Sequence, residues 1–434
     1  MSARALFQGE TIIIRSAEKI VLGLCALMFS LQVSAENWPN FHGPKGDNIS
    51  PDKGLLKSWP QKGPELLWKY EGIGSGFSTV SVVDGVIYTA GCTDKNTMVY
   101  ALDSSGKLLW QSELGDPLTE PKLIPGTRGT PTIKDGKAYA LSPLGVLGCF
   151  NAKDGAKLWE KDLADSKVGA RTPGWRFSES FLIDGNRLFV SVAKKEFIYA
   201  YDKDTGKKIW STSGFTDALA YCSPSIIEFN GIRQLVTMSA RYVVSFDIES
   251  GKMLWSAKQE SLGMNVATPV MADNRVYVSS SYKCGTKCLE LSADGGGIAV
   301  KEAWSSGLLD SVLGAVVLVN GKYYGGDNYS SLRGFTCLDA KTGEEPATAA
   351  YLTTQFETAR RIGSITYADG MLYYLRNDGM LYLINGDCKI ISKFKLPPDS
   401  NTPCWAHPVV LDGRLYVRHD KVLYVYDVKS EKGL

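Results

Sequence analysis

The sequence predicts an all-β protein, an eight-bladed β-propeller built from four-stranded antiparallel blades. Eight times along the 434 residues an apolar run ends in a two-residue turn signal and a second run follows, at separations of 43 to 51 residues. The turn pairs are Asp84-Gly85, Asp135-Gly136, Asp184-Gly185, Asn230-Gly231, Asp273-Asn274, Asn320-Gly321, Asp369-Gly370 and Asp412-Gly413. A repeat of this length with only strand-like segments inside it is typical of a radial propeller and not of a helical solenoid.

Each repeat contains four short strand-like segments, and the third repeat shows them clearly. Its segments cover residues 181–183, 187–190, 197–201 and 207–210. Asp-Gly and Asn-Gly suit the first hairpin because both central positions of a two-residue turn need positive φ. A second glycine turn precedes the fourth strand, as at Gly106, Gly155, Gly206, Gly251 and Gly343.

The fourth strand of most repeats ends in tryptophan. Trp110, Trp159, Trp210, Trp255 and Trp304 recur at intervals of 45 to 51 residues. A blade buries both faces against its neighbours, so one large flat side chain per blade is expected to act as a wedge between blades. Repeats six and seven lack this tryptophan, and Pro346 and Phe394 lie near the equivalent places.

The two ends of the chain complete each other. Trp68, within residues 66–70, belongs to a fourth strand that has no earlier strands of its own blade, while the last repeat stops after its third strand at residues 422–426. We therefore expect the N-terminal strand to finish the last blade, which removes the open edges of the ring. Residues 36–434 are predicted to form this single domain.

Residues 1–35 have the pattern of a signal peptide with an N-terminal extension. Arg15 and Lys19 precede an apolar run over residues 20–31, and the small residues 33–35 suggest cleavage before Glu36. The run is too short for a transmembrane helix. The net charge of +2 indicates neither a nucleic-acid surface nor a basic membrane patch. The protein is expected in the periplasm or outside the cell.

Export into an oxidising compartment permits disulfides among the eight cysteines that follow residue 35. Cys284 and Cys288 flank a three-residue loop and are candidates for a disulfide across a hairpin. Cys149 and Cys337 align with Ala101 of the third strand and are expected to be buried free thiols. No metal site is predicted, because the chain has three histidines and no Cys-x-x-Cys pair.

Two repeat units carry a resemblance to a known family. Residues 101–110, Ala-Leu-Asp-Ser-Ser-Gly-Lys-Leu-Leu-Trp, and residues 338–344 resemble the pyrroloquinoline-quinone (PQQ) repeat. The chain after residue 35 resembles exported eight-bladed proteins of the quinoprotein alcohol dehydrogenase-like group. Residues 38–44, 129–132, 178–180 and 405–408 are similar to a bacterial subgroup described as PQQ-like or BamB-like.

The resemblance implies the fold and an envelope location, and it does not by itself imply an activity. Dehydrogenases of the superfamily stack PQQ between a tryptophan and a ring of two adjacent cysteines, bind calcium and use an aspartate base. This chain has no adjacent cysteine pair. Val312-Leu313-Gly314 also stands where the subgroup is expected to have His-His-Gly, so no catalytic residue is assigned.

Strand direction places both sets of regular turns on one face of the ring. The segments that lead into the first strands, and the turns between second and third strands, lie on the other face. Binding residues collect on such irregular loops. The candidates there are Arg128, Trp175, Arg176, Tyr221, Asn265, Arg361, Trp405 and His407. The arginines suggest an anion-binding mouth, and turns such as residues 327–329 and 376–378 have too few oxygens for calcium.

Two functions of different class follow. The first is a non-catalytic scaffold that binds a protein, peptide or glycan in the cell envelope through the irregular face. The second is an oxidoreductase that binds PQQ and calcium in the central funnel, with Trp175 or Trp405 stacked on the quinone. A hydrolase is disfavoured because no nucleophile and base pair is visible. The sequence does not indicate an oligomeric state.

Overall fold

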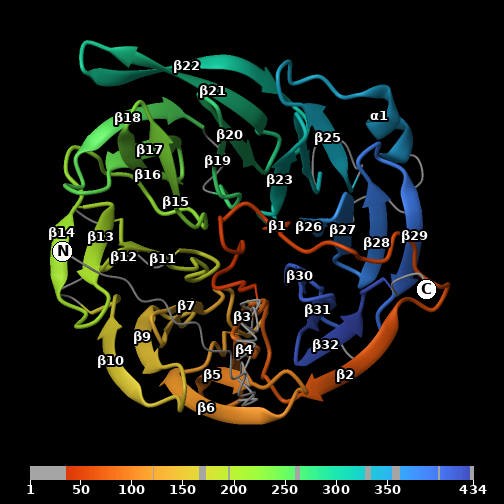
Figure 1. Ribbon diagram of the computed structural model, residues 1–434. Helices are drawn as coiled ribbons and strands as arrows, with labels where there is room; N and C mark the ends of the chain where they lie inside the picture. Colours follow the sequence, from red (N-terminus) through yellow and green to blue (C-terminus); the bar gives the residue numbers. More distant parts are fainter. Residues whose placement is uncertain are drawn as a thin grey trace, which may run out of the picture. The chain divides into compact units, whose positions relative to one another are not determined.

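The computed structural model describes residues 36–120, 122–165, 173–193, 196–259, 264–327, 334–353, 362–398 and 401–430. The predicted eight-bladed propeller is confirmed, because eight small antiparallel sheets follow one another around a ring (Figure 1). Residues Ala35–Leu434 form one compact unit. The predicted signal peptide, residues 1–35, lies outside the described residues and stays a prediction.

The first four blades each have four strands in simple up-and-down order. Blade one contains β3 (Ser81–Val83), β4 (Val86–Cys92), β5 (Thr97–Leu102) and β6 (Leu108–Gly115). Blade two contains β7 (Thr132–Lys134), β8 (Lys137–Leu141), β9 (Val146–Asn151) and β10 (Lys157–Asp162). Blade three contains β11 (Leu182–Asp184), β12 (Arg187–Ser191), β13 (Ile198–Asp202) and β14 (Lys208–Ser211). Blade four contains β15 (Ser225–Phe229), β16 (Ile232–Met238), β17 (Tyr242–Asp247) and β18 (Met253–Lys258).

The other four blades depart from this plan in several places. Blade five contains β19 (Val270–Ala272), β20 (Arg275–Ser280), β21 (Gly285–Asp294) and β22 (Gly297–Ser306). Blade six contains β23 (Val316–Val319), β24 (Lys322–Gly325) and β25 (Thr336–Asp339). Blade seven contains β26 (Gly363–Ala368), β27 (Met371–Arg376), β28 (Met380–Asn385) and β29 (Ile390–Lys395). Blade eight contains β30 (Val409–Leu411), β31 (Arg414–His419) and β32 (Val422–Asp427), completed by β2 (Glu65–Glu71).

The hairpin turns have the backbone that their sequence requires. In six of the eight turns both central residues have positive φ, as at Asp84 (51°) and Gly85 (76°). This conformation matches the right-handed twist of the strands on either side. The turn pairs therefore determine where each first strand ends and each second strand begins.

Tryptophan wedges join the blades as predicted. The ring of Trp68 in β2 packs against the glycine turn of blade one, where a Cβ atom on Gly106 would lie 2.6 Å from the indole. Its Nε1 atom donates to the carbonyl of Ser104 in the same turn. Four more interfaces repeat this packing, through Trp110 with Gly155, Trp159 with Gly206, Trp210 with Gly251 and Trp304 with Gly343.

Blade six replaces its outer strand with a helix. The helix α1 (Ala347–Thr353) begins directly after Pro346, which suits a helix start because proline has no N–H to leave unpaired. Ala349 and Leu352 of α1 are buried in the core between blades six and seven. The absence of a tryptophan in this repeat thus coincides with a change in the blade itself.

Ring closure follows the prediction from the sequence. Strand β2 pairs with β32, so the N-terminal strand supplies the outer strand of blade eight. The buried Arg418 adds a second closure between blades eight and one. Its guanidinium donates to the carbonyls of Gly74, Ser78 and Ala90 in blade one. Burial lowers the pKa of Arg418 to about 10.

The segment before β2 crosses the ring, a feature that no sequence pattern predicts. Trp38 is fully buried and pairs with Val82 of blade one through two backbone hydrogen bonds. Farther along, β1 (Ile49–Ser50) adds to blade seven as a parallel strand beside β26. Figure 1 shows this red and orange segment passing through the centre of the ring before it reaches β2. The centre of the propeller is therefore filled from one side by the chain's own residues.

The expected Cys284–Cys288 disulfide stays a prediction. Cys288 is buried in the strand β21, which begins at Gly285 directly after Cys284. Cys149 and Cys337 are buried, as expected.

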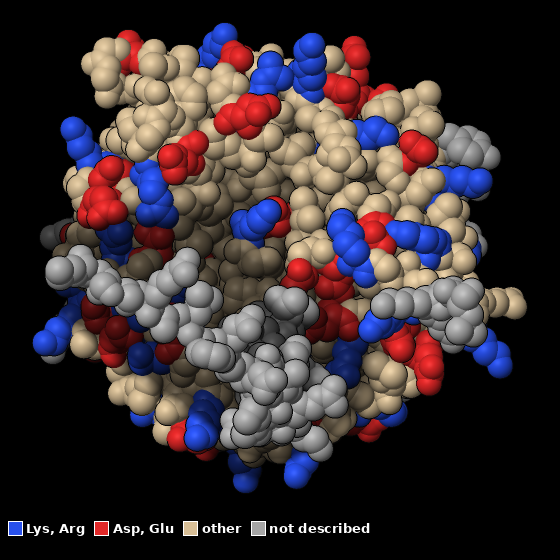
Figure 2. All heavy atoms as spheres, in the orientation of Figure 1, with Lys and Arg blue, Asp and Glu red and all other residues tan. Residues whose placement is uncertain are grey.

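The visible surface carries charges of both signs. Basic and acidic side chains are interspersed around the rim in Figure 2, and the hollow near the centre of that face shows mainly uncharged residues. No helix among the described residues is long and apolar enough to cross a membrane.

Candidate functional site

A pocket of about 540 Å³ lies where the eight blades converge. Every blade contributes to it through the segment that leads into its first strand. The lining residues are Phe77, Arg128, Trp175, Ser178, Tyr221, Ser223, Met264, Val266, Val312, Leu313, Ile362, Trp405 and His407, joined by Phe41 from the N-terminal segment and Tyr282 from the β20–β21 turn. Eleven of these fifteen side chains are aromatic or aliphatic, so the pocket is chiefly apolar.

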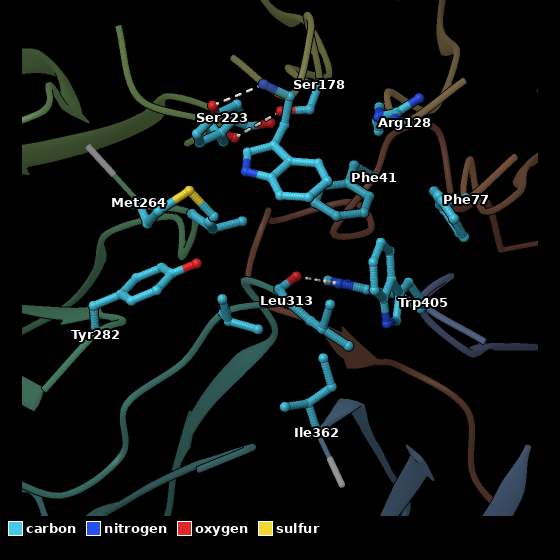
Figure 3. A pocket seen from close by; sticks show the side chains of 15 residues that line it. Phe41, Phe77, Arg128, Ser178, Ser223, Met264, Tyr282, Leu313, Ile362 and Trp405 are labelled. Carbon is cyan, nitrogen blue, oxygen red and sulfur yellow. Dashed lines mark hydrogen bonds between the residues drawn. The ribbon is translucent and has the colours of Figure 1, made fainter. Parts of the chain in front are cut away.

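One wall consists of contacting side chains from three neighbouring blades. The rings of Phe77 and Trp405 lie 4.7 Å apart between centroids, with their planes tilted by 41°. The guanidinium of Arg128 lies over the Phe77 ring, 5.8 Å from its centre. Figure 3 shows these three side chains along one side of the pocket. Packed aromatic side chains have few rotatable bonds, so they hold a preformed surface for a ligand.

The floor of the pocket comes from the N-terminal segment. The ring of Phe41 lies 4.0 Å from that of His42 and 4.5 Å from that of His407, between centroids. The Nε2 atom of His407 is 2.9 Å from the carbonyl of Leu313, and the carbonyl can only accept, so this nitrogen carries the proton. Burial lowers the pKa of His407 to about 4. The floor is therefore an uncharged aromatic layer at neutral pH.

The segment before β11 forms the most exposed part of the wall. Trp175 is 43% exposed, and its backbone N–H donates to the hydroxyl of Tyr221 in blade four. Ser178 Oγ donates to the Tyr221 carbonyl at 3.4 Å. These bonds position Trp175 at the pocket while leaving its indole accessible. An exposed tryptophan held in place by its backbone is a suitable contact for a partner.

The opposite wall comes from blade five. Met264 and Tyr282 project towards the centre from this side, facing Trp405 and Phe77 across the pocket (Figure 3). The flexible thioether of methionine adapts to different apolar shapes. This wall is therefore more adaptable than the aromatic wall opposite.

The two described candidate arginines are already engaged within the protein. Arg128 donates to the carbonyls of Ile124 and Gly126, and burial lowers its pKa to about 10. Arg176 forms an ion pair with Glu120. Arg176 therefore has an acidic neighbour, and the anion-binding mouth suggested by the arginines stays a prediction. Arg361 lies outside the described residues.

Other candidates also have structural roles. The side chain of Asn265 is fully buried, and its amide donates to the carbonyls of Ser239 and Gln259. Arg376 pairs with Asp378 two residues away. Of the eight residues predicted from the sequence, the structure brings Arg128, Trp175, Tyr221, Trp405 and His407 to one pocket.

The apolar residues of the pocket could not be recognised as site residues from the sequence. Phe41, Phe77, Met264, Tyr282 and Ile362 are ordinary core residue types, and no local pattern distinguishes them from packing residues. One signal was available for Phe41. It lies beside Trp38 in a segment without strand alternation, where buried aromatics indicate a plug and not a strand.

The described lining does not fit a quinone held by calcium. PQQ carries several carboxylates, whereas Arg128 is the one cationic side chain in the lining, and its guanidinium already serves two backbone carbonyls. Within the described residues no three His, Cys, Asp or Glu side chains are grouped so as to hold a metal ion. Trp175 and Trp405 do provide flat apolar surfaces, which suit other ligands as well.

Comparison with known proteins identifies relatives of the same architecture. A family model described as "Outer membrane protein assembly factor BamB" matches residues 53–177 and 95–348. The outer membrane protein assembly factor BamB of Burkholderia pseudomallei is 30% identical over 108 residues, which cover 24% of this chain and 25% of that protein. The chain spans between a quarter and a half of the length of the curated BamB relatives that it matches.

Solved structures share the fold at low sequence identity. BamB from Moraxella catarrhalis superposes with a TM-score of 0.58 at 15% identity, covering 85% of this chain and 99% of that one. Quinohemoprotein alcohol dehydrogenase from Comamonas testosteroni superposes with a TM-score of 0.58 at 12% identity, covering 92% of this chain and 81% of that one. BamB and an alcohol dehydrogenase thus resemble the chain equally well in fold.

Proposed function

Because the chain belongs to the family of the outer membrane protein assembly factor BamB, we propose that it is a non-catalytic scaffold that binds a protein partner in the cell envelope. The observation that carries the proposal is the central pocket, which all eight blades line with mainly aromatic and aliphatic side chains. Apolar pockets with a few fixed polar groups are the usual form of a preformed binding site.

The chemistry of the lining favours a protein or peptide over a glycan. A glycan presents many hydroxyl groups, and each needs a polar partner when it is buried. The pocket offers Arg128, Ser178, Ser223 and few other polar side chains, and Arg128 is already bonded. A peptide needs only an apolar side chain to fill this space. We propose that a partner inserts one or two large apolar side chains between the Phe77–Trp405 wall and Met264.

We propose a location in the cell envelope as part of the same function. The BamB relatives are described as outer membrane protein assembly factors, and the first 35 residues have the pattern of a signal peptide. An exported protein should start at Glu36 after processing. Terminal sequencing of the protein released from the envelope tests this, and retention of Met1 would contradict it.

A photo-crosslinking experiment tests the binding site. Replacing Trp175 with a photoreactive phenylalanine analogue in the exported chain should give a specific crosslink to one envelope protein. The matched control places the same analogue at Leu158 on β10, which is 47% exposed and lies away from the pocket. Equal crosslinking from both positions would contradict a pocket-specific partner.

Affinity measurements with the crosslinked partner then test the contact itself. Trp175→Ala should weaken binding by about 10- to 100-fold, because exposed aromatic anchors contribute about 2 kcal/mol or more at interfaces. Leu158→Ala should leave the affinity unchanged. The dehydrogenase alternative predicts instead that the purified protein develops quinone absorbance and reduces a dye when PQQ and calcium are added. That result would overturn the scaffold proposal.

A further inference from the structure

One turn of the ring carries a cysteine where five others carry glycine. The turn between the third and fourth strands has a glycine with φ between 64° and 86° in blades one, two, three, four and six, at Gly106, Gly155, Gly206, Gly251 and Gly343. In blade seven the residue at this place is Cys388, with a φ of 58°. Side chains other than glycine are strained in this region, so such a residue suggests a function for its side chain.

Hydrogen bonds establish that the two turns are equivalent. In blade one the N–H of Gly106 donates to the carbonyl of Asp103, and in blade seven the N–H of Cys388 donates to that of Asn385. The side chain of Asp103 accepts from the N–H of Lys107, and Asn385 does the same for Lys389. The strain at Cys388 therefore does not arise from a different turn.

The turn of blade seven also contacts different residues of the preceding blade than the five glycine turns do. In five interfaces the turn glycine packs against a tryptophan of the preceding blade. Blade six has α1 after its third strand, and the turn of blade seven is held by two other bonds. Lys322 Nζ and Tyr324 Oη both donate to the carbonyl of Gly386, at 2.8 and 2.9 Å. Tyr324 is paired in the sheet with Cys337 of β25, so these bonds bring the turn to Cys337.

The two thiols contact each other. Cys337 and Cys388 belong to the same buried cluster and are 0% and 3% exposed. A hydrogen bond between their side chains lowers the pKa of Cys388, and the same bond together with burial raises that of Cys337. Lys322 favours the thiolate at both. Cys388 is the more exposed thiol of the pair, so we assign it as the one that meets an oxidant.

Two further cysteines act as internal controls. Cys149 and Cys288 occupy the position of Cys337 in blades two and five, since each pairs with the outer-strand tryptophan of its own blade. The turns that they face contain Gly206 and Gly343 and no cysteine. Their thiols hydrogen-bond to Tyr139 and Tyr277 instead.

We propose that Cys337 and Cys388 form a disulfide that links blades six and seven. The cross-link takes the place that a tryptophan wedge has at five other interfaces. The Cys388 thiolate attacks a disulfide of a thiol oxidant, such as oxidised glutathione or a disulfide oxidoreductase, and one oxidant thiolate leaves. The Cys337 thiolate then attacks the sulfur of Cys388 in this mixed disulfide and displaces the second oxidant thiolate. The two thiols lose two protons and two electrons, and the oxidant disulfide is reduced to two thiols.

Thiol counting in the chain from residue 36 tests this proposal. The protein is equilibrated with reduced or oxidised glutathione, unfolded in an alkylating reagent and weighed by mass spectrometry. The oxidised sample should carry two fewer alkyl groups, and peptide mapping should join Cys337 to Cys388. Full alkylation of the oxidised sample, or a bond between other cysteines, would overturn the proposal. The outcome does not depend on which ligand occupies the pocket.

Two variants distinguish an effect of the disulfide bond from an effect of side-chain packing. Cys388→Gly restores the residue of the five other turns, so it should fold and yet show no bond. Cys149→Ser removes the matched thiol and should leave the bond intact. Reduction should lower the melting temperature of the wild type by about 4 °C, from a disulfide contribution of a few kcal/mol. The melting temperature of Cys388→Gly should not respond to reductant, and an equal response in both would contradict the proposal.

Discussion

The imidazole rings of His42 and His407 stack at a centroid distance of 5.5 Å with their planes 13° apart. His42 comes from the N-terminal segment and His407 from the segment before β30, and both are buried. Burial and the proximity of His407 lower the pKa of His42 well below 6.5, and burial lowers that of His407 to about 4. The segment that fills the ring is thus held by a pair that has to remain uncharged.

This pair predicts a loss of stability in mild acid. The folded pKa values lie below the unfolded value of 6.5, so the unfolded state binds more protons between about pH 4 and 6.5. The stabilisation is complete above pH 6.5 and is lost as the pH falls. Urea unfolding of the wild type and of His407→Gln at pH 7 and 4.5 measures this loss of stability. Between these two pH values the free energy of unfolding of the variant should fall by about 3 kcal/mol less than that of the wild type. Identical pH dependence in both would contradict the pairing.

A buried carboxyl predicts a second loss of stability, this one as the pH rises. Glu179 accepts from the N–H of Ser191, and burial raises its pKa to about 8. Its folded pKa exceeds the unfolded value of 4.5, so stability falls as the pH rises towards 8. Between pH 6 and 9 the free energy of unfolding of the wild type should fall by about 3 kcal/mol, whereas that of Glu179→Gln should not show this fall. The check is urea unfolding across this range, with Glu160→Gln on the exposed face of β10 as the control.

The tryptophan wedge at the point where the ring closes predicts that removing the Trp68 ring lowers the stability of the protein. Trp68→Ala removes the ring that packs on Gly106 and the hydrogen bond to Ser104, which should cost about 3 kcal/mol. Leu67→Ala is the control, because the Leu67 side chain is 39% exposed beside it. Thermal unfolding compares the two, and equal shifts would mean that the assigned closing strand does not bear on stability.

The buried guanidinium of Arg418 predicts that closure of the ring also depends on its hydrogen bonds to blade one. Arg418→Met leaves several buried carbonyls of blade one without a donor, which should cost more than about 3 kcal/mol. Arg414 also reaches blade one, at the carbonyl of Ser104, but this bond is exposed to solvent. Arg414→Met should therefore cost less than about 1 kcal/mol. Chemical denaturation measures both, and a small effect at Arg418 would contradict its closing role.

The architecture could be predicted from the sequence alone. Turn chemistry is local, so the positive φ at Asp84 and Gly85 could be predicted from the two residues alone. The position of Trp68, one strand ahead of its blade, likewise required β2 to pair with β32. The side of the ring that holds Trp175 and Trp405 followed from strand direction.

Contacts between residues far apart in the sequence depend on the folded ring and could not be predicted. Phe41 and Met264 become a pocket because eight separate segments converge, and the sequence marks neither as anything but apolar. Arg128 and Arg176 resembled free cations until the fold brought carbonyls and Glu120 to them. Cys337 resembled a lone buried thiol until the turn of blade seven brought Cys388 beside it. A repeat specifies its own turns and strands through local backbone preferences, whereas side-chain partners across blades depend on how the closed ring packs.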